Sequence, residues 1–331
     1  MTTLGRLKIV FIGGSSRAGS TLLERMLGEV PGFVSAGEVH YIWQRGFGEN
    51  RPCGCGQPFR TCEFWRQVAN EAFGSTVSAQ AARAYDLFRF LDRPRYLPQI
   101  AIGLRTSAFR ARLLEYQTIL DQLYRSIGTV SGAEFLIDSS KEPATAYLLS
   151  TMPQVDLHLV HLVRDSRAVA FSWQRTRKRN PHSEGGSDGS DMPIHGPARS
   201  AGMWAYRNLA FGLMNATGGR LRGLTGMANP PRYFRVRYED LIADPRATLT
   251  AILDSWGIRH PRLDFIVRDR TVRLGPNHIL SGNPMRFTTG DVALRLDQEW
   301  RETMRPRHER LVRLITLPWL WRYGYLRDHS G

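Results

Sequence analysis

The sequence predicts an α/β protein with a parallel sheet flanked by helices. Short apolar runs end in glycine or charged residues and alternate with helical patterns, as buried parallel strands followed by helices do. The chain has 331 residues, 42% of them hydrophobic, which is enough to bury a large core. The expected strands are Leu7–Ile12, Phe135–Ile137, Val155–Val163 and Tyr233–Arg237.

The first expected strand, LKIVFI, runs into paired glycines and is followed by a helical pattern over Ser20–Leu27. This order predicts a strand, a tight turn and a helix at the start of the chain. Between Cys62 and Ser131 no strand pattern occurs, and arginines interrupt amphipathic segments such as FRARLLEYQTILDQLY. We expect a helical insertion there, over about residues 63–130.

Later segments complete the expected single domain over residues 1–331. The stretch from Asn180 to Ser200 is rich in Gly, Pro and Ser, which predicts a mobile loop over about residues 178–200. The loop either gates a site or is an inert insertion, and the sequence does not choose. After Asp291 a helix-like stretch reaches Leu314, and the aromatic LPWLWRYGYL that follows is expected to pack on the core.

The chain is strongly basic, with 45 cationic and 30 anionic residues and a net charge of +15. Only Lys8, Lys141 and Lys178 are lysines, so 42 of the cations are arginines. A guanidinium group binds phosphate or sulfate in a planar, two-pronged way, so this balance favours an anionic partner. An arginine-rich genome would give the same balance, so charge alone does not identify the anion.

The sequence also predicts where the protein works. No apolar run reaches the roughly 18 residues that a bilayer crossing needs, and the opening lacks a secretory cleavage pattern. Cys53, Cys55 and Cys62 are an odd number in one short stretch, which argues against a secreted disulfide framework. We therefore expect a cytoplasmic protein without a membrane span.

The turn after the first expected strand has the framework of a phosphate-binding loop. Gly14 and Gly19 are separated by four residues, SSRA, and the hydroxyl residues Ser20 and Thr21 follow. Backbone N–H groups of such a turn can surround an anion. A nucleotide triphosphatase carries a lysine after the second glycine, whereas here the cation, Arg17, lies earlier in the loop.

The segment GGSSRAGSTLLERML resembles the 5′-phosphosulfate loop of sulfotransferases that use 3′-phosphoadenosine-5′-phosphosulfate as donor. In that loop a cation, a glycine and two hydroxyl residues precede paired leucines. The usual proline and serine around the arginine are Ser16 and Ala18 here. The resemblance implies a P-loop NTPase-like fold, the phosphosulfate donor as co-substrate and no metal. It assigns to the donor's 5′ end Arg17, Ala18, Gly19, Ser20 and Thr21.

A second segment, VRDSRAVAFS, is similar to the family's 3′-phosphate motif. Arg164 stands at a strand end and Ser172 follows two helical turns later, so both can reach one anion. A capped helix with surface arginines is the alternative. Tyr238, in YEDL, and Arg286, in SGNPMR, match further nucleotide-binding landmarks of the family. The most similar branch is bacterial, with some likeness to tyrosylprotein sulfotransferases in GEV and SSKEP.

Sulfuryl transfer needs cations at the departing phosphate and a base at the acceptor. Arg17 and Lys141, which follows the expected strand Phe135–Ile137, are the candidate charge stabilisers. Glu38 resembles the catalytic glutamate that several sulfotransferases carry after the first helix. If this stretch is extended, Glu38 and His40 share a face, which makes His40 the reserve base or the orienting partner.

Other features leave alternatives open. The spacing of the three cysteines lacks a fourth ligand, so no metal site is predicted there. A P-loop kinase is the main rival, because FLID reads like a strand that ends in a magnesium-binding aspartate, Asp138. A nucleic-acid-binding protein is a weaker rival, since no groove-reading motif accompanies the charge. The acceptor is expected to be a hydroxyl, or an amine, of a small molecule, glycan or lipid. His158 and His161 are expected to be core histidines.

Overall fold

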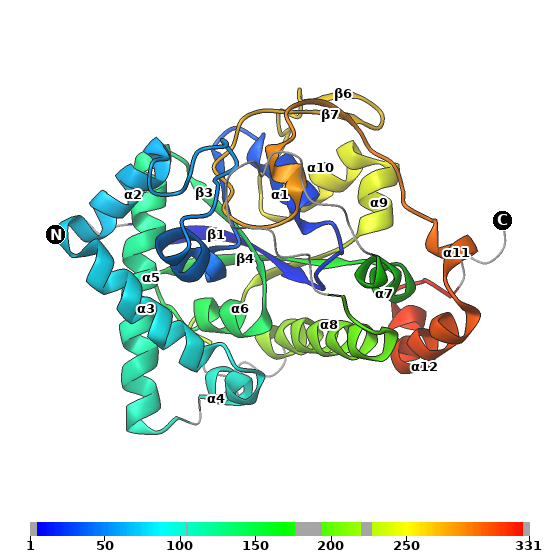
Figure 1. The fold of residues 1–331 in the computed structure, drawn as a ribbon, viewed down its shortest axis with the longest axis horizontal. Coiled ribbons are helices and arrows are strands. Elements are labelled where there is room, and N and C mark those ends of the chain that lie inside the picture. Colours follow the sequence, from blue (N-terminus) through cyan, green and yellow to red (C-terminus); the bar gives the residue numbers. More distant parts are fainter. Residues whose placement is uncertain (1–4, 104, 176–193, 220–226, 327–331) are drawn as a thin grey trace.

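A computed structural model describes residues 5–103, 105–175, 194–219 and 227–326. Its centre is a five-stranded parallel sheet in the order β2-β3-β1-β4-β5, which confirms the predicted fold class (Figure 1). The strands are β1 (Leu7–Gly14), β2 (Phe33–Gly37), β3 (Phe135–Lys141), β4 (Val155–Val163) and β5 (Arg232–Arg237). All four predicted strands are present. Strand β2, FVSAG, was not predicted because its small residues form no apolar run.

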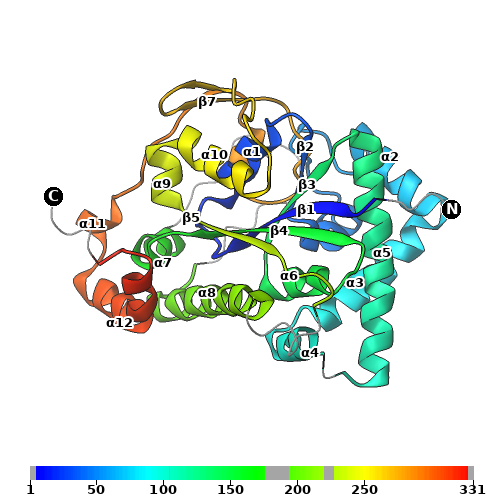
Figure 2. The ribbon, with the colours of Figure 1, turned by 180° about the vertical axis from the view of Figure 1, so that it is seen from behind.

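Alternate side chains of β1 face two separate parts of the core, as in a sheet covered on both faces. Val10 and Ile12 pack in one cluster with residues of α1 (Ser20–Gly28), α9 (Tyr238–Ala243) and α10 (Pro245–Ser255). Ile9 and Phe11 pack in the other with residues of α5 (Ser107–Ser131), α6 (Pro143–Ser150) and α8 (Pro197–Gly219). Figures 1 and 2 show α1, α9 and α10 on one side of the sheet and α6 and α8 on the other.

The helices expected over about residues 63–130 are α2 (Glu63–Phe73), α3 (Val77–Leu91), α4 (Leu97–Ile102) and α5. The described residues between Cys62 and Phe135 contain no strand. Helix α5 begins where the Thr106 hydroxyl accepts a hydrogen bond from the Phe109 N–H, at 3.2 Å, and it ends at Gly132 in the left-handed region. No described helix of the protein is long and apolar enough to cross a membrane.

The C-terminal third differs from the prediction. A small antiparallel sheet forms from β6 (Ile266–Arg268), β7 (Thr271–Leu274) and β8 (Gly290–Ala293), so the helix expected from Asp291 is wrong there. The helices are α11 (Trp300–Thr303) and α12 (Pro306–Arg322), because Pro306 starts a new helix. The aromatic end does pack on the core, where Leu320, Tyr323 and Tyr325 are buried with Trp204.

Most of the loop predicted over about residues 178–200 lies outside the described residues. Its last residues are helical, since α8 starts at Pro197. Helix α7 (Ser166–Gln174) follows β4 and ends before the expected start of the loop.

A buried arginine fastens the C-terminal segment to α1. The Nη1 atom of Arg25 donates to the carbonyl oxygens of Met285 (3.0 Å), Arg286 (3.2 Å) and Thr288 (2.9 Å). Its Nη2 atom donates to the carbonyl oxygen of Gly275 at 2.7 Å. One guanidinium group thus donates to four backbone acceptors, and the carbonyl oxygens of Met285 and Arg286 also accept from the Thr288 N–H and the Asn277 side chain.

We expect Arg25→Met to lower the free energy of unfolding by about 3 kcal/mol, because it removes the hydrogen bonds that the guanidinium group gives to the Gly275 and Thr288 carbonyl oxygens. Urea denaturation of the variant and the wild type measures this loss. Arg66→Met is the matched control, since Arg66 is exposed on α2 and pairs only with Glu63. Equal losses in both variants would contradict the structural role of Arg25.

Candidate active site

Each strand of the sheet carries one predicted site residue at its carboxyl end. Lys141 ends β3, while Glu38, Arg164 and Tyr238 directly follow β2, β4 and β5. Arg17 lies in the loop between β1 and α1. Because parallel strands end at one edge of a sheet, five segments far apart in sequence meet there.

The loop after β1 is built for close backbone approach. Gly14, at φ 137°, lies so close to β4 that an added Cβ would be 2.2 Å from the Leu162 carbonyl oxygen. Gly19, at φ 96°, packs against the Tyr238 ring, which leaves no room for a side chain. Arg17 is also left-handed, at φ 70°. Ala18 is buried, and Ser20 and Thr21 begin α1, so free N–H groups of the first helical turn face the loop.

Arg164 connects this loop with the end of β5. Its Nη1 atom donates to the Arg17 carbonyl oxygen at 3.1 Å, and its guanidinium carbon lies 4.6 Å from the centre of the Tyr238 ring. Its Nε atom is buried without a hydrogen-bond partner among the described residues. Ser172 is buried on α7, and the structure does not join it to Arg164 by a hydrogen bond.

The cation Arg17 itself lies over an aromatic ring. Its guanidinium carbon is 4.8 Å from the centre of the Trp173 ring on α7. This contact was not predicted, because nothing in the sequence couples position 173 to the loop. A guanidinium group can stack on an aromatic ring and also donate N–H groups in its own plane to an oxyanion.

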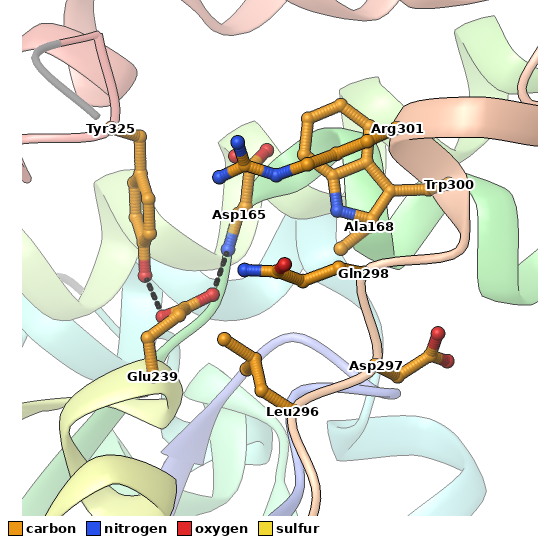
Figure 3. A pocket seen from close by; sticks show the side chains of 9 residues that line it. All are labelled: Asp165, Ala168, Glu239, Leu296, Asp297, Gln298, Trp300, Arg301 and Tyr325. Carbon is orange, nitrogen blue, oxygen red and sulfur yellow. Dashed lines mark hydrogen bonds between the residues drawn. The ribbon is translucent and has the colours of Figure 1, made fainter. Parts of the chain in front are cut away.

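A small pocket lies on the other side of Arg164 and is acidic. Figure 3 shows Glu239 accepting hydrogen bonds from the Asp165 backbone N–H, at 3.2 Å, and from the Tyr325 hydroxyl, at 2.7 Å. Burial raises the pKa of Glu239. Asp297 also lines the pocket. These three carboxyl groups outnumber the one cation that lines the pocket, Arg301, and this excess disfavours an anion there.

The segment after residue 280 packs against the start of α1, next to the loop that contains Arg17. The Asn283 N–H donates to the Thr21 hydroxyl at 3.3 Å, and Arg286 donates to the Gly282 carbonyl oxygen at 3.0 Å. A Cβ on Gly282 would be 3.2 Å from the Thr21 hydroxyl and 3.8 Å from Oε1 of Glu38. The structure thus brings the predicted residues Thr21, Glu38 and Arg286 into one region.

Glu38 and Lys141 form a buried ion pair. The Lys141 ammonium group donates to Oε1 of Glu38 and, at 3.0 Å, to the Ser139 carbonyl oxygen. A second cation, Arg45, places Nη1 3.5 Å from Oε2 of Glu38 and stacks on the Tyr41 ring. Arg45 was not predicted, because it belongs to no motif and its position depends on the fold.

The expectation that Glu38 and His40 share a strand face is wrong. Strand β2 ends at Gly37, in the left-handed region, and residues 39–41 form a short 3-10 helix. His40 is buried edge-on against the Tyr41 and Phe88 rings, and its Nε2 atom lies 3.7 Å from Asp92. Burial lowers its pKa to about 3, which makes it a weak base.

A buried carboxyl group on α1, that of Glu24, binds the segments that carry the ion pair. Glu24 accepts hydrogen bonds from the Gly37 N–H, at 2.7 Å, and from the Ser139 hydroxyl, at 2.6 Å. Gly37 directly precedes Glu38, and Ser139 lies two residues before Lys141. Burial raises the pKa of Glu24 to about 8. The sequence showed only a glutamate in a helix, with no sign that it faces the sheet.

Asp138, the aspartate on which the kinase alternative depends, already accepts hydrogen bonds from within the protein. Asp138 is fully buried within β3 and accepts hydrogen bonds from the Tyr124 hydroxyl, at 2.6 Å, and the Ser140 N–H, at 2.8 Å. His161 is a satisfied core histidine as expected, bonded to Tyr233 and Asn208. His158 is also in the core, where its Nε2 atom lies 3.4 Å from an Asp156 carboxylate oxygen.

The fold and this edge of the sheet define a P-loop-like transferase. A model of the sulfotransferase family matches residues 10–262, and the chain belongs to that family. Curated relatives include mouse carbohydrate sulfotransferase 5, 29% identical over 192 residues, which are 56% of this chain and 45% of that protein. Human carbohydrate sulfotransferase 6 is 28% identical over 166 residues, 48% of this chain and 39% of that protein. The chain thus matches less than half the length of either relative.

Solved structures that match the chain include two sulfotransferases. The sulfotransferase domain of the Synechococcus PCC 7002 olefin synthase has a TM-score of 0.47 and 22% identity, over 96% of this chain and 97% of that one. A sulfotransferase from Mycobacterium avium has a TM-score of 0.46 and 13% identity, over 97% of this chain and 77% of that one.

We expect Glu24→Gln to weaken the dependence of stability on pH. A carboxyl group whose pKa rises on folding stabilises the fold when protonated, so stability falls as pH rises from about 4.5 to about 8. Glutamine cannot ionise, and its amide can accept from the Gly37 N–H through oxygen and donate to the Ser139 hydroxyl through nitrogen. The difference between urea midpoints at about pH 5.5 and pH 8 should shrink, though not vanish, because burial also raises the pKa of Asp92 to about 8.

Glu71→Gln is the control for this measurement, since Glu71 is exposed on α2. It should leave the pH dependence of the wild type unchanged. A Glu24→Gln variant with the wild-type dependence would show that Glu24 does not take up a proton on folding.

Proposed function

We propose that this chain, acting as a single domain over residues 1–331, transfers a sulfuryl group from 3′-phosphoadenosine-5′-phosphosulfate to an acceptor hydroxyl or amine. The observation that carries the proposal is the carboxyl edge of the sheet. This edge carries two cations, Arg17 and Arg164, each of which can bind one anionic group, and a buried Glu38–Lys141 ion pair lies beside them. A donor with phosphate groups at both its 3′ and 5′ ends needs two such sites, whereas adenosine triphosphate needs one.

The donor's 5′-phosphosulfate fits the loop from Arg17 to Thr21. The left-handed backbone at Arg17 and Gly19 and the N-terminus of α1 direct N–H groups toward the loop. The 3′-phosphate fits Arg164, whose Nε atom lacks a hydrogen-bond partner among the described residues, with Ser172 as a further ligand. Arg286 is a further candidate for binding the donor nucleotide. The Tyr238 ring holds both Gly19 and Arg164, and so sets the distance between the two phosphate sites.

The transfer breaks the bond between sulfur and the phosphate oxygen and forms one between sulfur and the acceptor oxygen. Negative charge develops on the departing phosphate, where Arg17 and the Lys141 ammonium group stabilise it. The acceptor proton passes to the Glu38 carboxylate. The Glu38–Lys141 pair keeps the two groups together before substrates bind, and the acceptor hydroxyl replaces the ammonium group as the partner of Glu38.

A sugar hydroxyl is the first acceptor to test, because the curated relatives are carbohydrate sulfotransferases. Other small molecules and lipid hydroxyls follow. The reaction needs no metal on this proposal, and the usage of cysteine favours the cytoplasm.

Calorimetric titration with 3′-phosphoadenosine-5′-phosphate tests the donor site. We expect tight binding without added metal and much weaker binding of 5′-AMP and ATP, since each of these lacks the 3′-phosphate. Arg164→Ala should weaken bisphosphate binding by roughly 10- to 100-fold, the value of a charged hydrogen-bond pair. Arg66→Ala, on the exposed face of α2, is the control. A preference for ATP with magnesium would overturn the proposal.

Transfer of label from ³⁵S-phosphosulfate to a panel of sugars and phenols tests the chemistry. With an acceptor from this panel, Glu38→Gln should lower kcat by about 10²- to 10⁴-fold while leaving bisphosphate affinity near that of the wild type. Arg17→Ala and Lys141→Ala should also lower kcat. Unchanged kcat in the Glu38 variant would remove Glu38 as the base.

A further inference from the structure

All three cysteines of this chain meet one histidine at the side of the molecule next to α2. Cys53, Cys55 and Cys62 lie on one loop, while His278 belongs to the segment that leads to Ser281. The candidate ligand atoms of these four residues all lie within 4.8 Å of one another. The cysteine spacing had no fourth ligand in sequence, and the fold supplies it 216 residues after Cys62.

Four of the six ligand-to-ligand distances in this cluster match the edges of a tetrahedron around zinc. Zn–S bonds of about 2.3 Å and a Zn–N bond of about 2.0 Å give S–S edges of about 3.8 Å and S–N edges of about 3.5 Å. The Sγ atom of Cys62 lies 3.7 Å from the Sγ atoms of both Cys53 and Cys55. The Nδ1 atom of His278 lies 3.6 Å from Cys53 Sγ and 3.4 Å from Cys62 Sγ.

These separations do not fit a disulfide, whose sulfur atoms are about 2.05 Å apart. Three thiols and an imidazole are also a soft ligand set, which among the common divalent ions in tetrahedral sites favours zinc. Cys53 and Cys62 are buried and His278 is half-buried, whereas Cys55 is exposed. Cys55 therefore forms the outer vertex, and an ion can enter from its side.

The backbone around the cluster holds the ligands in place. The N–H groups of Cys55 and Trp65 donate to the sulfur atoms of Cys53 and Cys62, as outer-shell donors of a thiolate site do. The Trp65 indole N–H donates to the His278 carbonyl oxygen at 2.8 Å, and the Phe64 ring stacks on the imidazole ring. The ligands are thus positioned by their own chain segments.

We propose that Cys53, Cys55, Cys62 and His278 bind one zinc ion as a structural Cys₃His site. Binding releases the thiol protons to solvent and changes no oxidation state. All four positions of the tetrahedron come from side chains, so none remains open for water or substrate, and the ion acts on structure rather than on chemistry.

The site would connect the loop that carries the cysteines to the segment that closes the donor site. The Gly54 N–H donates to the Ile279 carbonyl oxygen at 2.9 Å, and Glu38 donates its N–H to the Leu280 carbonyl oxygen at 3.2 Å. The side chain of Asn277, next to the proposed ligand His278, donates to the Arg286 carbonyl oxygen at 2.7 Å. Zinc would therefore hold in place the segment around residues 277–280, which is hydrogen-bonded to the backbone of Glu38 and of Arg286.

Metal analysis of the full chain, purified without a metal-affinity tag, tests the site. We expect one equivalent of zinc, released when a mercurial reagent titrates the thiols. Cobalt(II) in place of zinc should give sulfur-to-cobalt charge-transfer bands and the intense visible bands of tetrahedral coordination. His278→Asn and Cys62→Ser should lose most of the bound zinc and lower the Tm. In each variant, 3′-phosphoadenosine-5′-phosphate should still stabilise the fraction of the protein that remains folded.

The histidine control is His260→Asn, since His260 is exposed and is not one of the four clustered residues. It should keep the full equivalent of zinc. Zinc-free protein with three titratable thiols, a disulfide among the cysteines, iron in place of zinc, or an octahedral cobalt spectrum would each overturn the proposal. The wild-type measurements decide the question even where a ligand variant fails to fold.

Discussion

The buried carboxyl group of Glu24 connects helix α1 with β2 and β3, the two strands that carry the Glu38–Lys141 pair. It belongs to the helix that follows β1, and it binds the N–H at the end of β2 and a hydroxyl on β3. A buried carboxyl group is costly unless it is protonated or hydrogen-bonded, and here its bonds hold Gly37 and Ser139 at a fixed separation. Glu38 and Lys141 follow these two residues and meet as an ion pair for that reason.

The arginines of the chain serve two different purposes in the structure. Arg25 and Arg167 are buried and satisfy backbone or carboxylate acceptors, so they stabilise the fold without facing a ligand. Arg17 and Arg164 instead stand at strand ends beside glycine and aromatic side chains. Net charge therefore says little about anion binding in this protein, since the position of each guanidinium group decides its role.

Motifs with a fixed local geometry were readable from the sequence. Apolar strand runs, the glycine-bounded loop and the helix after it follow from hydrophobic pattern and backbone freedom. Short elements were not readable, because β2 lacks an apolar run and β8 has the composition of a helix or a loop. The 3-10 helix after Gly37 was missed for the same reason, and with it the true orientation of His40.

The sequence by itself determined the α/β class, the family and the residues placed at strand ends, because each of these depends on short-range pattern. Only the tertiary structure decided which side chains meet. Arg45 reaches Glu38, Glu24 spans two strands, and His278 joins three cysteines more than 200 residues away. Such contacts arise from the order of strands in the sheet and the packing of distant segments, which no local pattern encodes.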